Sequence, residues 1–69
     1  MTLSDYLASL AGELRVGPFR RRRILAEVED HLRASVDERL APDVPRYEAE
    51  EAALARFGPY EDLAAGFNR

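Results

Sequence analysis

Residues 18–40 read PFRRRRILAEVEDHLRASVDERL, a stretch with no glycine or proline after its first position. Its apolar side chains keep the spacing of one helix face, at Ile24, Val28, Leu32, Val36 and Leu40. Charged residues fill most of the other positions, as in a helix with one solvated face. The stretch therefore predicts a long amphipathic helix from Pro18 or Phe19 to about Leu40, and this helix decides the fold.

The segment before this stretch predicts a shorter helix from about Leu3 to Arg15. Its apolar residues again share one face, at Leu3, Tyr6, Leu7, Leu10 and Leu14. Thr2 is the expected N-cap of this helix. Gly17 is expected in the left-handed conformation that ends many helices, and Pro18 suits the first turn of the next one. Together these features predict a helical hairpin.

The segment after the long stretch predicts two more helices. Pro42 and Pro45 cannot sit inside a regular helix, so they mark a connection. A third helix is expected at residues 45–57, Gly58 ends it, and a short fourth helix follows at residues 59–67. No segment alternates with period two, so strands are not expected. The predicted fold is all-α, a compact bundle of three helices plus a short fourth C-terminal helix.

The composition limits the size of the core. A chain of 69 residues supports one core, so residues 1–69 are expected to form a single helical domain. The hydrophobic fraction of 46% includes eleven alanines, so the core is thin, and docking on a partner or on a second copy as a homodimer would add stability. The absence of cysteine excludes disulfides and thiolate sites. Without a signal sequence or a run of ~20 apolar residues, a cytoplasmic location is expected, either alone or as the N-terminal cytosolic part of a longer membrane protein.

The charges are distributed unevenly along the chain. Ten arginines and no lysine stand against thirteen acids, which gives a net charge of -3. The arginines concentrate in one basic corner, made of Arg15, Arg20, Arg21, Arg22 and Arg23. These arginines could pair with acids such as Glu13 or Glu27, or they could contact an acidic protein, anionic lipid head groups or DNA phosphates. Specific nucleic-acid binding is the least favoured, because the rest of the chain is acidic and positive charge opposes the dipole at a helix N-terminus.

Glu27 and His31 are the first residues to consider for catalysis. They lie at positions i and i+4, which places them one turn apart on the same helix face. A carboxylate beside an imidazole could serve in proton transfer or metal binding. A zinc site, however, takes about three protein ligands, and the chain has no second histidine and no cysteine. The pattern favours a structural pair, or an imidazole hydrogen-bonded to a neighbouring connection, and predicts no enzyme activity, no metal and no cofactor.

Three segments, taken in order, resemble a known family. The first is the Tyr6-Leu7 pair followed by Leu10, and the second is the long helix with its E-[IV]-x-x-H-[IL] motif at Glu27, Val28, His31 and Leu32. The third runs from Phe57-Gly58 to Leu63-Ala64. Their order and spacing resemble the HAAS-type helical domain, also called DUF1700-like. Two positions depart from the family pattern: Pro59-Tyr60 stands where Asp-Pro is usual, so the Asp cap of the last helix is missing, and Arg22-Arg23 stands where Glu-Arg is usual.

The resemblance implies a bacterial, cytoplasmic signalling or adaptor domain that is not an enzyme and that often precedes transmembrane helices or lies near transport permeases. It also implies a protein partner, with a PadR-like transcription regulator as the candidate. In this interpretation Glu27, His31 and Gly58 are a structural signature. The candidate partner-binding residues are Phe19, Arg20, Arg21, Arg22, Arg23, Tyr47 and Tyr60. The alternative is a small DNA-binding helical domain that uses the Arg20–Arg23 patch.

Overall fold

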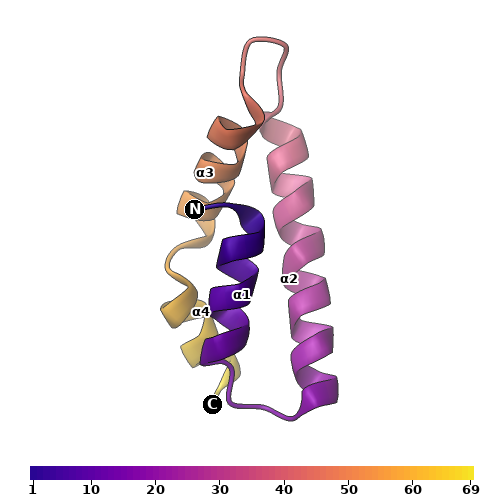
Figure 1. Cartoon of the computed structure of the whole chain (residues 1–69), viewed down its shortest axis with the longest axis vertical. Helices are drawn as coiled ribbons and strands as arrows, with labels where there is room; N and C mark the ends of the chain where they lie inside the picture. The colour runs from indigo at the N-terminus through magenta and orange to yellow at the C-terminus, as the bar shows by residue number, and fades with distance from the viewer.

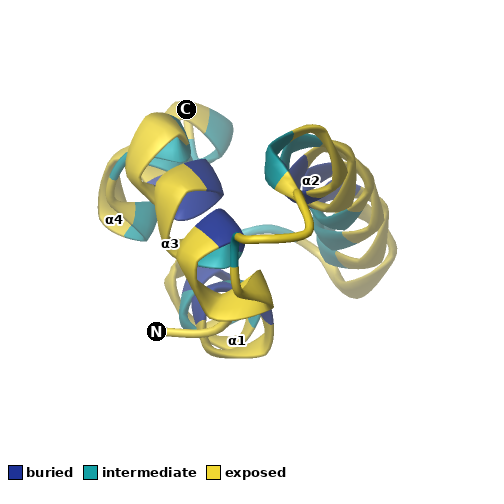
Figure 2. Ribbon diagram, turned by 90° about the horizontal axis from the view of Figure 1, so that it is seen from above, coloured by how far each residue is buried: buried dark blue, intermediate teal, exposed yellow.

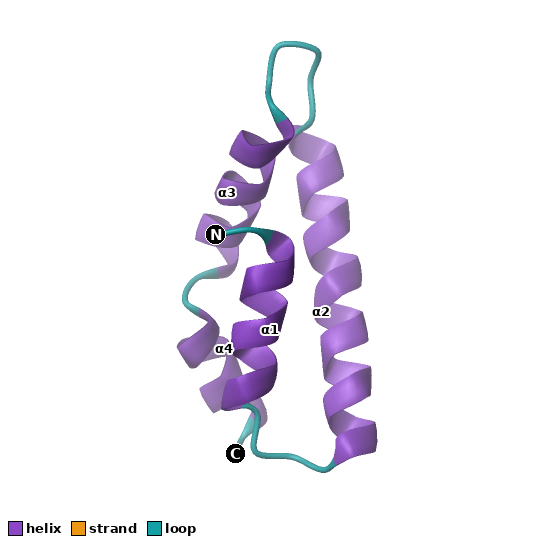
Figure 3. Ribbon diagram, viewed as in Figure 1, coloured by secondary structure: helices purple, strands orange, loops and turns teal.

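The computed structural model describes residues 1–69 as four helices without a strand (Figure 3). The helices are α1 (Leu3–Glu13), α2 (Pro18–Arg39), α3 (Arg46–Phe57) and α4 (Tyr60–Phe67). Each observed bound lies within two residues of its prediction, so the all-α expectation is confirmed. Outside the helices, an isolated bridge between Ala41 and Val44 closes the connection between α2 and α3.

Thr2 caps the start of α1, as predicted. Its hydroxyl accepts from the Asp5 backbone N–H at 3.1 Å, and the Thr2 N–H donates to the Asp5 carboxylate at 3.2 Å. This reciprocal pair satisfies two backbone donors that a helix N-terminus otherwise leaves free. The Asp5 carboxylate also lies in the first turn, where the helix dipole favours negative charge.

The two glycines that precede prolines behave differently. Gly58 has φ of 86°, so it adopts the positive-φ conformation expected of a glycine that ends α3. Gly17, in contrast, is extended, with φ of -65° and ψ of 164°, and the prediction of a left-handed Gly17 was wrong. The chain already leaves α1 at Leu14, and a residue before proline is pushed toward extended backbone by the proline ring.

The last helix begins without a side-chain cap. Pro59 occupies the N-cap position and forms no capping hydrogen bond, in line with the missing aspartate noted in the sequence. The helix still starts at Tyr60, and its first turn carries Glu61 and Asp62. Their negative charges interact favourably with the positive end of the helix dipole and stabilise the start of the helix.

The helices are arranged around one elongated hydrophobic core. α3 packs on α2, α4 packs on α1, and α1 packs on α2 (Figure 1), in a molecule of 41 × 18 × 16 Å. The buried positions of each helix turn inward (Figure 2). The core consists of Leu3, Tyr6, Leu10, Leu14, Ile24, Val28, Leu32, Val36, Ala49, Ala53, Leu54 and Ala64. Because α2 spans most of the length of the molecule, its two ends lie far apart. Residues near the start of α2 and residues near its end therefore belong to different surfaces.

Candidate protein-interaction surfaces

Two of the four consecutive arginines hold the ends of other helices. Arg21 donates from Nη2 to the carbonyls of Leu14 and Val16, each at 3.4 Å, and Arg20 donates from Nη2 to the Phe67 carbonyl at 3.4 Å. The Leu14 and Phe67 carbonyls lie at the C-terminal ends of α1 and α4, where free acceptors and the helix dipole favour positive charge, and the Val16 carbonyl lies in the connection between α1 and α2. None of the four arginines pairs with Glu13 or Glu27, which was one of the alternatives left open by the sequence; Arg20 and Arg21 reach backbone carbonyls instead.

Asn68 is a connecting residue that the sequence did not indicate. Its side-chain oxygen accepts from the Arg15 backbone N–H at 2.7 Å, and its amide nitrogen donates to the Glu13 carbonyl at 2.9 Å. The same side chain thereby ties the end of α4 to the end of α1. An asparagine just after a helix is common, and nothing in the sequence shows which distant carbonyl it will reach.

The remaining arginines of the run are free. Arg22 and Arg23 form no hydrogen bond and no ion pair, and both are exposed. Phe19 lies beside them with 84% of its surface exposed, the largest fraction among the exposed large hydrophobic side chains. No acidic residue occurs between Leu14 and Ala26. We call the surface formed by Phe19, Arg22 and Arg23 the basic end.

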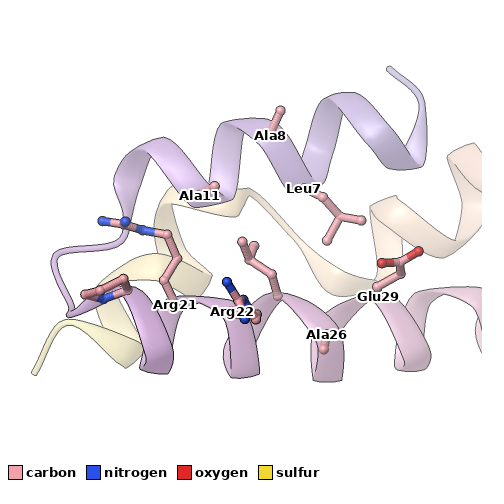
Figure 4. A pocket seen from close by; sticks show the side chains of 9 residues that line it. Leu7, Ala8, Ala11, Arg21, Arg22, Ala26 and Glu29 are labelled. Atoms are coloured by element: carbon pink, nitrogen blue, oxygen red, sulfur yellow. The ribbon is translucent and has the colours of Figure 1, made fainter.

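A shallow groove of about 610 Å³ runs between α1 and α2 (Figure 4). α1 contributes Leu7, Ala8 and Ala11 to its lining, and α2 contributes Pro18, Arg21, Arg22, Leu25, Ala26 and Glu29. Figure 4 shows Arg22 and Glu29 on α2, on either side of Ala26. The groove is therefore apolar in its middle, with the cationic side chains of Arg21 and Arg22 toward one end and the anionic side chain of Glu29 toward the other.

A second cleft, of about 390 Å³, lies where α1 meets the α3–α4 connection. The Tyr6 hydroxyl donates to the Gly58 carbonyl at 3.0 Å, and the Tyr6 and Tyr60 rings meet edge to face with centroids 6.1 Å apart. Burial, and then the nearby negative charge of Glu61, raise the pKa of the Tyr6 phenol above its ordinary value of 10.0. Tyr60 is half-buried in this pair, so it is less exposed than Phe19 and Tyr47, and its role in partner binding stays a prediction.

The predicted contact residues do not form one patch. Tyr47 is 63% exposed, as expected, but it lies in the first turn of α3, next to the connection that closes the upper end of Figure 1. Phe19 lies at the start of α2, at the opposite end of the molecule. A single small partner surface cannot cover both residues.

Glu27 and His31 face solvent on α2. Both residues are exposed, and neither forms a hydrogen bond or an ion pair. The expected structural pair is therefore absent, because the buried face of α2 is occupied by Val28 and Leu32 and turns positions 27 and 31 outward. No group of three or more potential metal ligands occurs in the structure.

The family model described as HAAS matches residues 5–66. The chain belongs to the HAAS family. No curated protein and no solved structure gave a significant match.

The HAAS match includes both candidate surfaces. The basic end, the α1–α2 groove and the Tyr6–Gly58 contact all lie within residues 5–66, whereas the Thr2 cap and the Asn68 bridge lie outside this range. None of the four helices combines the length and the apolar composition that a bilayer crossing requires. The HAAS domain is thus a small helical unit with two neighbouring candidate interaction surfaces, the basic end and the α1–α2 groove, which share Arg22.

Proposed function

We propose that this HAAS domain is a non-enzymatic protein-interaction module, a cytoplasmic signalling adaptor whose partner is a PadR-like transcription regulator. The observation that carries the proposal is the basic end, where the 84% exposed Phe19 lies beside two arginines that have no partner within the chain. Burying a phenylalanine contributes about 1.5 to 3 kcal/mol. Docking at this end therefore recovers stabilisation that folding alone does not provide.

The chemistry of the basic end defines the surface that it fits. Aromatic and arginine side chains dominate the residues that contribute most at protein interfaces. Because the side chains of Arg22 and Arg23 form no hydrogen bond or ion pair within the chain, a partner that binds them breaks no existing polar interaction. The complementary surface on the regulator is an apolar recess for Phe19 with carboxylates at its rim.

The positions of the titratable residues support a role without catalysis. His31, the one histidine, is exposed and has no hydrogen bond to orient its imidazole. The nearest carboxylate along the same helix face, Glu27, is also unpaired. An efficient general base is held within hydrogen-bond reach of a partner that orients it, and neither side chain has such a partner.

The test is calorimetric titration of the full chain into a purified PadR-like regulator from the same genome. Phe19→Ala and Arg23→Glu should each weaken binding by about tenfold, which corresponds to 1.4 kcal/mol. Arg56→Glu on α3 is the matched control, because Arg56 is also exposed and unpaired. Equal affinity for all four proteins, or no binding of the wild type, would contradict the proposal.

The same variants separate the DNA-binding alternative. In that case the wild type would bind a DNA duplex in preference to the regulator, with an affinity that falls steeply as salt rises. Arg23→Glu would then weaken duplex binding, and Phe19→Ala would have little effect. This outcome would replace the adaptor proposal.

A further inference from the structure

The α1–α2 groove is a surface separate from Phe19 and Arg23, and no element of the chain covers it. Leu7 and Leu25 are only partly buried along it, and Ala8 and Ala26 are exposed. The other faces of α1 and α2 are occupied by α4 and α3 respectively. The groove is therefore an apolar helix–helix face that still lacks a partner.

The charges of the groove complement themselves. Arg22 and Glu29 are seven residues apart on α2, about 10.5 Å along the axis at a rise of about 1.5 Å per residue. The midpoint between them falls between Leu25 and Ala26. A two-fold axis through this midpoint, perpendicular to α2, reverses the helix and brings each Arg22 opposite the partner's Glu29. The α2 helix of a second copy, placed antiparallel, therefore has the charges needed to pair with both Arg22 and Glu29.

Both charged groups have capacity for a new contact. Arg22 forms no hydrogen bond or ion pair within the chain. Glu29 is contacted by Arg33 at 2.8 Å from Nε and 2.6 Å from Nη2, and both contacts engage the same oxygen, Oε2. The second carboxylate oxygen, Oε1, has no partner, and a carboxylate can accept from both oxygens at once.

The shape of the groove admits a second helix. Small side chains at a helix–helix contact let the axes approach to about 8 Å, and Ala8, Ala11 and Ala26 line the groove. In a dimer with two-fold symmetry, α2 of each copy lies over the groove of the other copy. Such an isologous contact closes on itself and gives a dimer rather than a filament.

We infer that two copies of this chain associate through their α1–α2 grooves, with the two α2 helices antiparallel and each Arg22 paired with the partner's Glu29. The contact covers Leu7 and Leu25 and adds buried apolar area to a core of twelve buried residues. The inference goes beyond the proposed function. The two surfaces share Arg22, which belongs to the basic end and also lines the groove, whereas Phe19 and Arg23, the two positions that the regulator titration tests, play no part in the dimer contact.

The test is a charge exchange, read out as molar mass by sedimentation equilibrium of the full chain. The wild type should be a dimer. Arg22→Glu and Glu29→Arg should each raise the dissociation constant of the dimer by about 100-fold. Each substitution makes both symmetric 22–29 pairs repulsive, and each repulsive pair costs on the order of tenfold in affinity. The double variant Arg22→Glu plus Glu29→Arg should restore the dimer, since every pair is again of opposite sign.

Controls distinguish loss of the dimer from loss of the fold. Glu27→Arg makes the same charge change on the solvent-facing side of α2 and should leave the molar mass unchanged. Circular dichroism should give the same helix content for all variants at equal concentration and below the melting transition, which shows that each variant is still folded.

A monomeric wild type at millimolar concentration would overturn the inference. So would a dimer that both single variants leave intact, or a double variant that stays monomeric. Glu29→Arg should bind the regulator as tightly as the wild type does. The dimer test and the regulator-binding test can therefore give opposite answers.

Discussion

The contact between Tyr6 and Gly58 makes the most exact stability prediction. Tyr6→Phe removes the hydroxyl that donates to the Gly58 carbonyl at 3.0 Å, and it keeps the ring that packs edge to face on Tyr60. Only 2% of Tyr6 is exposed, and Gly58 is partly buried, so the Gly58 carbonyl loses its donor at a partly buried position. The perturbation therefore isolates one hydrogen bond between α1 and the turn that follows α3.

The expected loss follows from the energetics of buried hydrogen bonds. Removing one partner of such a bond costs about 1 to 2 kcal/mol. In a domain of this size, each kcal/mol lowers the melting temperature by about 4 to 8 °C. Thermal unfolding of Tyr6→Phe, followed by circular dichroism at neutral pH, should show a decrease in this range.

The pH dependence gives the prediction a second readout. Burial and Glu61 raise the pKa of Tyr6 in the folded state above 10.0, the value of an unperturbed phenol. The stabilisation by Tyr6 is therefore fully present below pH 10 and is lost as pH rises through the higher folded-state pKa. The difference in stability between wild type and Tyr6→Phe should narrow above pH 10.

Tyr60→Phe is the matched control, because the Tyr60 hydroxyl forms no hydrogen bond and its ring keeps the contact with Tyr6. This variant should unfold within about 0.5 kcal/mol of the wild type, as surface-like changes do. If Tyr6→Phe is as stable as Tyr60→Phe, or if the gap to wild type does not change above pH 10, the reasoning about this contact is refuted.

Three further variants test other parts of the fold by thermal or urea unfolding. Gly58→Ala places a Cβ at φ of 86° and should cost about 1 to 2 kcal/mol; an unchanged midpoint would show that this turn is not under conformational constraint. Leu32→Ala empties a fully buried position and should cost about 2 to 5 kcal/mol, much of the stability of so small a domain; a loss below 1 kcal/mol would place Leu32 outside the core. His31→Ala removes an exposed side chain without contacts and should change the free energy of unfolding by less than about 0.5 kcal/mol, so a large loss would restore the structural pairing of His31 with Glu27.

The apolar spacing of the sequence was enough to predict the helices. Ile24, Val28, Leu32 and Val36 are spaced at intervals of four and form the buried face of α2. The Thr2 cap was also predictable, because the capping residue and its N–H partner are three positions apart. Helix positions and caps depend on residues that are close in sequence, so they can be predicted without knowledge of the tertiary structure.

The candidate site was harder to predict because it depends on contacts between distant segments. Arg20 and Arg21 belong to one run with Arg22 and Arg23, yet the first two reach the carbonyls of α1 and α4 and the last two are free. Which arginine meets which carbonyl is set by where α1 and α4 end in space. The same reason explains the groove, whose lining comes from two helices and has no signature in either one alone.

Gly17 shows a different kind of limit. The Gly-Pro pairs at Gly17 and Gly58 look alike in sequence, and only Gly58 has a positive φ. At Gly58 the glycine itself ends the helix, with its N–H bonded to the Leu54 carbonyl at 3.0 Å. At Gly17 the helix has already ended at Leu14, so no reversal is required there.

The central claim is that the basic end receives the protein partner. The most direct measurement is the backbone amide NMR spectrum of the labelled chain during titration with a PadR-like regulator. The account predicts that the largest shift changes or line broadening fall on Phe19 to Arg23 at the start of α2, and that residues around Tyr47 at the start of α3 change little. Changes confined to α3 and the 40–45 connection, or a spectrum that does not change at saturating regulator, would contradict it.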